Sequence, residues 1–163
     1  MAALSLGSRI SIMDHKDQFA ITHRGHCVIA DHLVPIDHYE DDFVSIAERF
    51  IGVPYYWGGK TSLGLDCSGL IQIALDAAGL FAPRDSDMQE KSIGKPLVTA
   101  EALSHLKRGD LIFWKGHVGV MRDAEMLLHA SGHHMLVVSE PLQQAIDRIS
   151  AKGAGPVTSI KRL

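Results

Sequence analysis

The chain has 163 residues, of which 46% are apolar and 21% charged, and its formal net charge at pH 7 is −3. These values are typical of a globular protein with one catalytic domain and room for a small additional module. Lys and Arg never occur more than two in a row, so neither nucleic acid nor an acidic membrane surface is expected as a partner.

Membrane insertion and secretion are not predicted from the sequence. No apolar stretch approaches the length of a transmembrane helix, and residues 1–7 lack the basic and apolar regions of a signal peptide. The chain is therefore predicted to be cytoplasmic. Its two cysteines, Cys27 and Cys67, do not make a disulfide framework.

The first 38 residues are predicted to form a small β module. Short alternating segments separated by polar turns predict strands at 9–13, 19–22 and 26–30, with turns at 14–17 and 23–25. With the ending Leu33-Val34-Pro35, this pattern resembles the latter part of a bacterial SH3-like domain. A sheet of so few strands with unpaired edges does not fold alone. This partial module at 1–38 is therefore expected to need contacts with the next domain, or strands upstream, in order to fold.

A second domain is predicted over 39–163, after an acidic linker. Apolar residues at helical spacing predict an amphipathic helix over 41–51, ended by Gly52 and Pro54. A glycine-rich irregular stretch then leads to Asp66, a residue type that caps helix N-termini.

Cys67 is the first candidate for chemistry, because it falls in the first turn of the helix that Asp66 caps. The apolar run that follows and Gly79 after it predict a helix of about three turns. Unpaired amides and the helix dipole favour an anion at this position, and a nearby imidazolium lowers a thiol pKa further. The sequence therefore predicts an activated nucleophile, with a small buried apolar residue as the alternative.

The rest of the domain is predicted to be mainly antiparallel sheet. Residues 80–99 are expected to form a long surface connection, and one or two helical turns are expected within 101–106. The remaining predicted elements are strands at 111–114, 117–121, 126–130 and 135–138, a helix from Pro141 to near Gly153, and a last strand within 156–163. Helices followed by an antiparallel sheet indicate the α+β class.

Two of the ten histidines, His117 and His129, lie within predicted strands. A turn centred on Asp123 makes residues whose numbers sum to 246 direct neighbours across the strands, and these two histidines satisfy that sum. Adjacent imidazoles are able to hydrogen-bond, so that one acts as a base while the other fixes its tautomer. With a cysteine at a helix N-terminus, this is the general plan of a thiol hydrolase.

The motifs of the second domain resemble those of the NlpC/P60 family, the papain-like cysteine peptidases of bacterial cell walls. They occur in the family's order and cover roughly residues 41–163: Pro54-Tyr55-Tyr56-Trp57-Gly58-Gly59, Asp66-Cys67-Ser68-Gly69, Gly109-Asp110-Leu111, His117-Val118-Gly119 and Leu128-His129-Ala130. The resemblance implies a papain-like fold, in which helices pack on an antiparallel sheet. It also implies cleavage of an amide bond in peptidoglycan stem peptides or muropeptides, most often between γ-D-glutamate and diaminopimelate or lysine, without a cofactor.

The resemblance also implies roles for single residues. Cys67 is the nucleophile, His117 the general base, His129 the orienting group, and Tyr55 helps the Cys67 amide to form the oxyanion hole. Together with the SH3-like segment, the resemblance is to enzymes of the dipeptidyl-peptidase VI type, which recycle muropeptides. In that type Asp66 and Ser68 help to hold an L-alanine ammonium.

Two further residues, Arg84 and Ser86, begin the predicted 80–99 connection and are candidates for contacts with substrate carboxylates. Three alternatives to a peptidase remain open. The set Cys67, His117 and His129 suits a catalytic zinc ion, although no C-x-x-C or H-E-x-x-H accompanies it. The second alternative is a non-catalytic wall-binding module. The third is a thiol amidase or acyltransferase, which would use the same arrangement of nucleophile and base.

Overall fold

Three short antiparallel strands make up the N-terminal unit, Met1–Tyr39. The structure is a computed structural model that describes residues 3–163, apart from the side chains at 99 and 100. The strands lie in the order β1 (Ile12–Lys16), β2 (Phe19–Thr22) and β3 (Cys27–Ile29), followed by a 3-10 turn, η1 (Ala30–His32).

The first hairpin of this unit differs from the prediction, because β1 continues through the expected 14–17 turn to Lys16. The chain reverses at Asp17, whose φ of 52° is a left-handed conformation that aspartate tolerates. In residues 3–39 only Ala20 is fully buried, so the unit has almost no core of its own.

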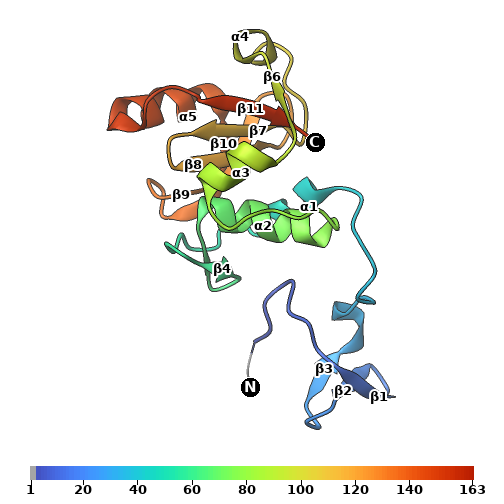
Figure 1. The fold of residues 1–163 in the computed structure, drawn as a ribbon. Helices are drawn as coiled ribbons and strands as arrows, with labels where there is room; N and C mark the ends of the chain where they lie inside the picture. The colour runs from blue at the N-terminus through green and yellow to red at the C-terminus, as the bar shows by residue number, and fades with distance from the viewer. Residues whose placement is uncertain (1–2) are drawn as a thin grey trace. The chain divides into compact units, whose positions relative to one another are not determined.

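The second unit, Glu40–Leu163, starts one residue beyond the predicted boundary. It consists of an antiparallel sheet covered by helices, and the predicted α+β class is confirmed (Figure 1). Its helices are α1 (Phe43–Glu48), α2 (Cys67–Ala77), α3 (Ser86–Ser92), α4 (Thr99–Ala102), α5 (Leu142–Ile149) and the π-helical turn η2 (Ser150–Ala154). Its sheet strands are β6 (Lys95–Leu97), β7 (Leu111–Trp114), β8 (His117–Met121), β9 (Met126–Ser131), β10 (Leu136–Pro141) and β11 (Ser159–Arg162).

The six sheet strands lie in the order β10-β9-β8-β7-β11-β6, so the last strand of the chain is inserted between β7 and β6. A separate two-stranded hairpin, β4 (Lys60–Thr61) and β5 (Gly64–Leu65), lies within the glycine-rich stretch. Both faces of the sheet are covered: α2 packs on β8 and β9 from one side, and α5 packs on β9 and β10 from the other (Figure 1).

Successive residues of each strand face opposite sides of the sheet, so apolar side chains form a core on each side. On the α5 side a cluster forms around Trp114, Met121 and Leu127, with Leu142 of the helix. Phe113, Val118 and the other alternate residues of these strands are also buried. Within residues 3–163, no helix has the length and apolar character needed to span a bilayer.

The predicted long connection at 80–99 is wrong, because this stretch contains α3 and β6. The helix was missed because its sequence is almost entirely polar and has no apolar period. Its buried anchor is Gln89, whose Nε2 donates to the carbonyl oxygens of Ser68 (2.9 Å) and Pro83 (2.8 Å). Glu90 also ties the helix to the last strand, because its Oε1 accepts from the hydroxyls of Thr158 and Ser159, both at 2.7 Å. The bounds of α1 and α5 also differ slightly: α1 is shorter than 41–51, and Pro141, the last residue of β10, is the N-cap of α5 rather than its first helical residue.

Candidate active site

Cys67 is the first residue of α2, as predicted, and it is 7% exposed. The Asp66 carboxylate caps the helix by accepting from the Gly69 amide at 2.8 Å. Gly69 carries no side chain where a Cβ would overlap the carbonyl oxygen of Gly59, so the glycine-rich loop lies directly on the first turn of α2. The backbone amides of Val118, Ser68 and Cys67 itself hydrogen-bond toward the sulfur. The thiol therefore lies against the residue that follows His117.

The predicted lowering of the Cys67 pKa is not what the structure gives. Burial raises the pKa of the thiol, the Val118 amide lowers it, and the nearby Asp66 carboxylate raises it again, with a net rise. Desolvation is the largest of these effects, because almost no water reaches the sulfur. In the free protein Cys67 is a neutral thiol at neutral pH.

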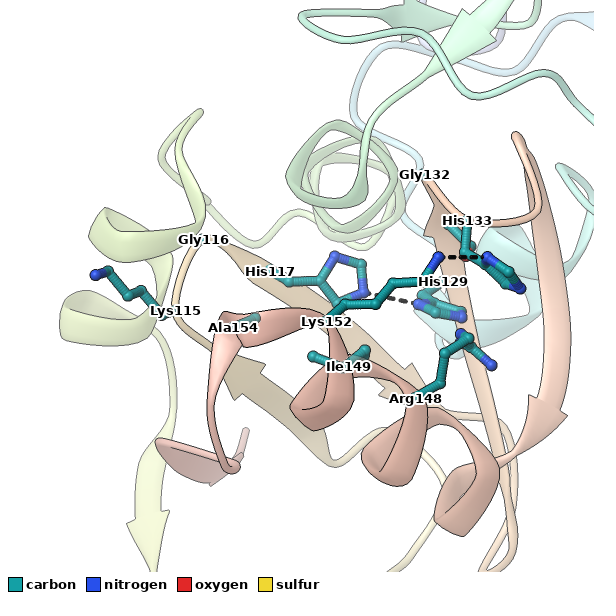
Figure 2. A pocket seen from close by; sticks show the side chains of 11 residues that line it. Lys115, Gly116, His117, His129, Gly132, His133, Arg148, Ile149, Lys152 and Ala154 are labelled. Carbon is teal, nitrogen blue, oxygen red and sulfur yellow. Dashed lines mark hydrogen bonds between the residues drawn. The ribbon is translucent and has the colours of Figure 1, made fainter.

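The two histidines singled out in the sequence are brought together. His117 Nε2 and His129 Nδ1 are 2.7 Å apart, and the rings meet edge to face with centroids separated by 5.0 Å. Figure 2 shows this contact, with the second nitrogen of His117 pointing away from His129. The ring of Trp114 lies at a centroid distance of 5.7 Å from His117, so this tryptophan packs behind the site.

The hairpin register that predicted this pair is wrong. The paired residues Val120–Leu128 and Met121–Leu127 have numbers that sum to 248 rather than 246. The cause is the turn: the Asp123 carboxylate accepts from the amides of Glu125 and Met126, both at 2.8 Å, and centres the turn on residue 124. The shift keeps both histidines on one face but makes them diagonal neighbours, a separation that aromatic rings still bridge.

Gly119 is the residue that the true register places opposite His129. An alanine Cβ there would lie 2.8 Å from Leu127 Cδ1 and 3.2 Å from His129 Cβ, both in the buried sheet. We expect Gly119→Ala to lower the free energy of unfolding by about 1–3 kcal/mol, as overpacking in cores does. Urea denaturation measures this, and an unchanged midpoint would contradict the register.

Both histidines are neutral at neutral pH. Burial lowers the pKa of His117 to about 3, and the neighbouring His129 and Arg148 lower it further, against the opposing effect of Glu140. Burial also lowers the pKa of His129, although its hydrogen bond to Glu140 acts in the opposite direction.

Sequence reasoning missed the Glu140–Arg148 pair behind the histidines. Glu140 Oε1 accepts from His129 Nε2 at 2.6 Å, and the Arg148 guanidinium of α5 binds both carboxylate oxygens at 2.5 and 2.6 Å. The predicted strand stopped at residue 138, two residues short of Glu140. The available signal was an acidic residue two positions after the apolar run from Leu136 to Val138.

The predicted substrate-binding residues gather beside Cys67. The Arg84 guanidinium donates to both oxygens of Asp66, at 2.8 and 2.6 Å, and to Ser68 Oγ at 2.9 Å. Burial raises the pKa of Asp66, but hydrogen bonds from Arg84, Gly69 and Gly58 outweigh it, and the net pKa is lowered. Asp66 is therefore an ionised group already paired with Arg84, and its contact with an alanine ammonium stays a prediction.

Tyr55 and Ser86 flank this cluster. Burial raises the pKa of Tyr55, and so do the Cys67 sulfur and the Asp66 carboxylate, so the phenol keeps its proton. Its amide donates to the Met135 carbonyl at 2.8 Å, which fixes the segment to the start of β10. Ser86 is the first residue of α3 and is partly exposed.

Two cavities adjoin these elements. One, of about 230 Å³, lies beside His117 and His129 and is lined by three cationic side chains, Lys115, Arg148 and Lys152 (Figure 2). In it Lys152 Nζ is 2.7 Å from His133 Nδ1. The other, of about 360 Å³, follows the glycine-rich loop from Tyr56 to Gly64.

The zinc alternative does not match the geometry. His117 Nε2 and His129 Nδ1 face each other at hydrogen-bond distance rather than a common third point. Among the residues that the structure describes, no three His, Cys, Asp or Glu side chains are grouped so as to hold a metal ion.

Known proteins resemble this chain in sequence. The sequence model of the NlpC/P60 family matches residues 52–150. Dipeptidyl-peptidase 6 of Lysinibacillus sphaericus is 35% identical over 106 residues, which are 65% of this chain and 38% of the relative. The γ-D-glutamyl-L-lysine dipeptidyl-peptidase of Bacillus subtilis is 36% identical over 98 residues, which are 55% of this chain and 31% of the relative. The chain thus spans well under half the length of these relatives.

The fold also has solved counterparts. The crystal structure of an NlpC/P60 family protein from Bacillus cereus superposes with a TM-score of 0.75 and 22% identity, covering 98% of this chain and 55% of that one. This match includes the small N-terminal sheet, in agreement with the partial SH3-like segment that the sequence suggested.

Proposed function

The chain belongs to the NlpC/P60 family, and from that premise we propose that it is a cysteine peptidase that hydrolyses an amide bond in peptidoglycan-derived peptides. The observation that carries this proposal is that the start of α2, with Cys67, lies against β8, with His117. A thiol at the start of α2 lies against the Val118 amide, and the preceding residue, His117, is hydrogen-bonded to His129. These are the nucleophile, the base and the orienting group of a thiol hydrolase.

The proton of Cys67 is transferred during attack rather than before it, because thiol and imidazole are both neutral in the free protein. His117 Nδ1, the nitrogen not bonded to His129, takes the thiol proton while the sulfur bonds to the substrate carbonyl carbon. The imidazolium then gives that proton to the leaving amine, and the C–N bond breaks to leave a thioester. Water deprotonated by His117 hydrolyses the thioester and restores the thiol.

The carbonyl oxygen becomes negatively charged in this step and needs donors. We assign this role to the Cys67 amide, which lies at the start of α2 and has no partner within the helix ladder, and to the Tyr55 hydroxyl, which stays protonated. Donors fixed in advance in a site that excludes water stabilise an oxyanion far more than water does.

For the substrate we propose a γ-D-glutamyl bond to a diamino acid, either meso-diaminopimelate or L-lysine, in a stem peptide or muropeptide. A glutamyl residue linked through its γ-carboxyl keeps a free α-carboxylate on the same residue as the scissile carbonyl. Arg84 and Ser68 are the polar groups beside Cys67 that suit this carboxylate, with Ser86 two residues beyond Arg84. Such an enzyme takes part in cell-wall turnover or muropeptide recycling.

We expect the protein to cleave L-Ala-γ-D-Glu-meso-diaminopimelate into L-Ala-D-Glu and diaminopimelate. The α-linked isomer moves its free carboxylate away from Arg84, so its kcat/KM should be lower on the order of 10²-fold or more, the usual effect of misplacing the reacting carbonyl. Mass spectrometry of timed digests measures both rates. Equal cleavage of the two isomers would contradict recognition of the γ-linkage.

The N-acetylated γ-linked peptide tests whether a free N-terminal amine is recognised. Slower cleavage of this form supports a dipeptidyl-peptidase specificity, and equal cleavage supports an endopeptidase. Running the reaction in ¹⁸O-labelled water separates hydrolysis from transfer, because only hydrolysis puts the label in the new D-glutamyl γ-carboxylate. Formation of an acyl-enzyme without labelled acid would favour the acyltransferase alternative.

A further inference from the structure

We propose that Glu140 and Arg148 act as one positioning unit for the base: Glu140 sets the tautomers of both histidines, and Arg148 balances its charge so that His129 stays neutral. Glu140 is a buried residue, 8% exposed, and its carboxylate lies between His129 Nε2 at 2.6 Å and the Arg148 guanidinium. The inference rests on the proposed function only where turnover is the readout.

The hydrogen bonds leave one arrangement of protons. Glu140 is ionised, since hydrogen bonds from His129 and Arg148 overcome its burial and hold its pKa far below the usual range. A carboxylate only accepts, so the neutral His129 carries its proton on Nε2 and presents a lone pair at Nδ1. His117 then donates from Nε2 across the 2.7 Å contact, and its lone pair is at Nδ1. This is the nitrogen that must take the thiol proton.

Protonation of His129 would break this arrangement. Both of its nitrogens would then donate, and Nδ1 would no longer accept from His117. To keep the contact, His117 would have to accept at Nε2 and hold its proton at Nδ1, which removes the base. A buried carboxylate next to His129 favours that protonated state, because an opposite charge stabilises the imidazolium.

Arg148 removes this tendency. Its guanidinium binds both oxygens of Glu140, so the carboxylate keeps its orientation toward His129 while its charge is balanced. The other titratable groups around the unit are His117 from β8, Lys152 from η2, and His133 and His134 before β10. His134 Nε2 lies 3.5 Å from Glu140 Oε2, and Lys152 adds a further cation beside His133. None of these adds a second negative charge at His129.

Removing the charge of Arg148 while keeping its aliphatic stem tests the unit. Without Arg148, Glu140 raises the pKa of His129, so the inactive protonated form persists to higher pH. We expect the acid limb of kcat/KM for Arg148→Met to move to higher pH by about one unit, with activity largely recovered above that limb. Arg148→Lys keeps the charge and should keep the profile close to that of the parent.

Glu140→Gln should act differently. The amide of a glutamine offers its oxygen to Arg148 and its NH₂ to His129, which reverses the tautomers of both rings. We expect kcat to fall about 10–100-fold at all pH values, the size of effect that follows removal of a group that orients a metal-binding histidine. Arg122→Met removes an arginine from an exposed pair with Glu48 and is the matched control, with an unchanged profile expected.

A spectroscopic readout separates this inference from the proposed function. Imidazole ¹⁵N shifts of the substrate-free protein report each ring's tautomer and pKa whether or not a peptide is cleaved. We expect neutral His129 protonated at Nε2 in the parent, and a raised His129 pKa in Arg148→Met. An Arg148→Met protein that is folded, with parental ¹⁵N shifts and a superimposable pH profile, would overturn the inference. A pair that merely fastens α5 to the sheet would lower stability in both variants without moving either readout.

Discussion

Cys67→Ala is expected to lose activity on the γ-linked peptide by on the order of 10⁶ in kcat, the cost of removing a covalent nucleophile in enzymes of this plan. Alanine fills the buried site at the start of α2 without disturbing the Asp66 cap, so the fold should be retained. The measurement is turnover at saturating substrate, with circular dichroism to verify folding. Residual activity within about 10²-fold of the parent would exclude Cys67 as the nucleophile.

The second cysteine supplies the control. Cys27 is exposed in β3 of the N-terminal unit and is not part of the site described above. Cys27→Ala should therefore keep the activity of the parent. A large loss in Cys27→Ala would contradict the assignment of chemistry to the second unit.

His117→Ala is expected to be nearly as damaging, with a loss on the order of 10⁶ in kcat, because nucleophile and base act as one unit. A neutral thiol, as burial makes Cys67, depends on this base more than a preformed thiolate would. The double variant with Cys67→Ala should lose little more than either single variant, and that non-additivity is the diagnostic measurement. Additive losses would show that His117 acts elsewhere than on the thiol.

His129 gives the internal comparison. It donates to Glu140 and accepts from His117 but transfers no proton, so His129→Ala should cost on the order of 10⁴ or less. His129→Asn should recover part of this loss, because an amide oxygen still accepts from His117. A His129→Ala protein as impaired as His117→Ala would contradict these separate roles.

Several features of the site follow from the sequence near each residue. Asp66 and Gly79 mark the ends of one helix, and these local signals place Cys67 in its first turn. The period of two along a strand puts His117 and His129 on one face under any register that shifts by an even number. Such features depend on interactions between residues close together in the sequence, so they can be predicted from the sequence alone.

The tertiary structure decided what depends on distant groups. The Asp123 turn set the register of the histidines, Gln89 ordered a polar helix where a loop was predicted, and β11 entered the sheet between β7 and β6. Burial made Cys67 a neutral thiol, reversing the expectation from the helix dipole. Glu140 and Arg148 meet only because β10 and α5 pack together, and desolvation and long-range ion pairs of this kind are fixed by which elements become neighbours.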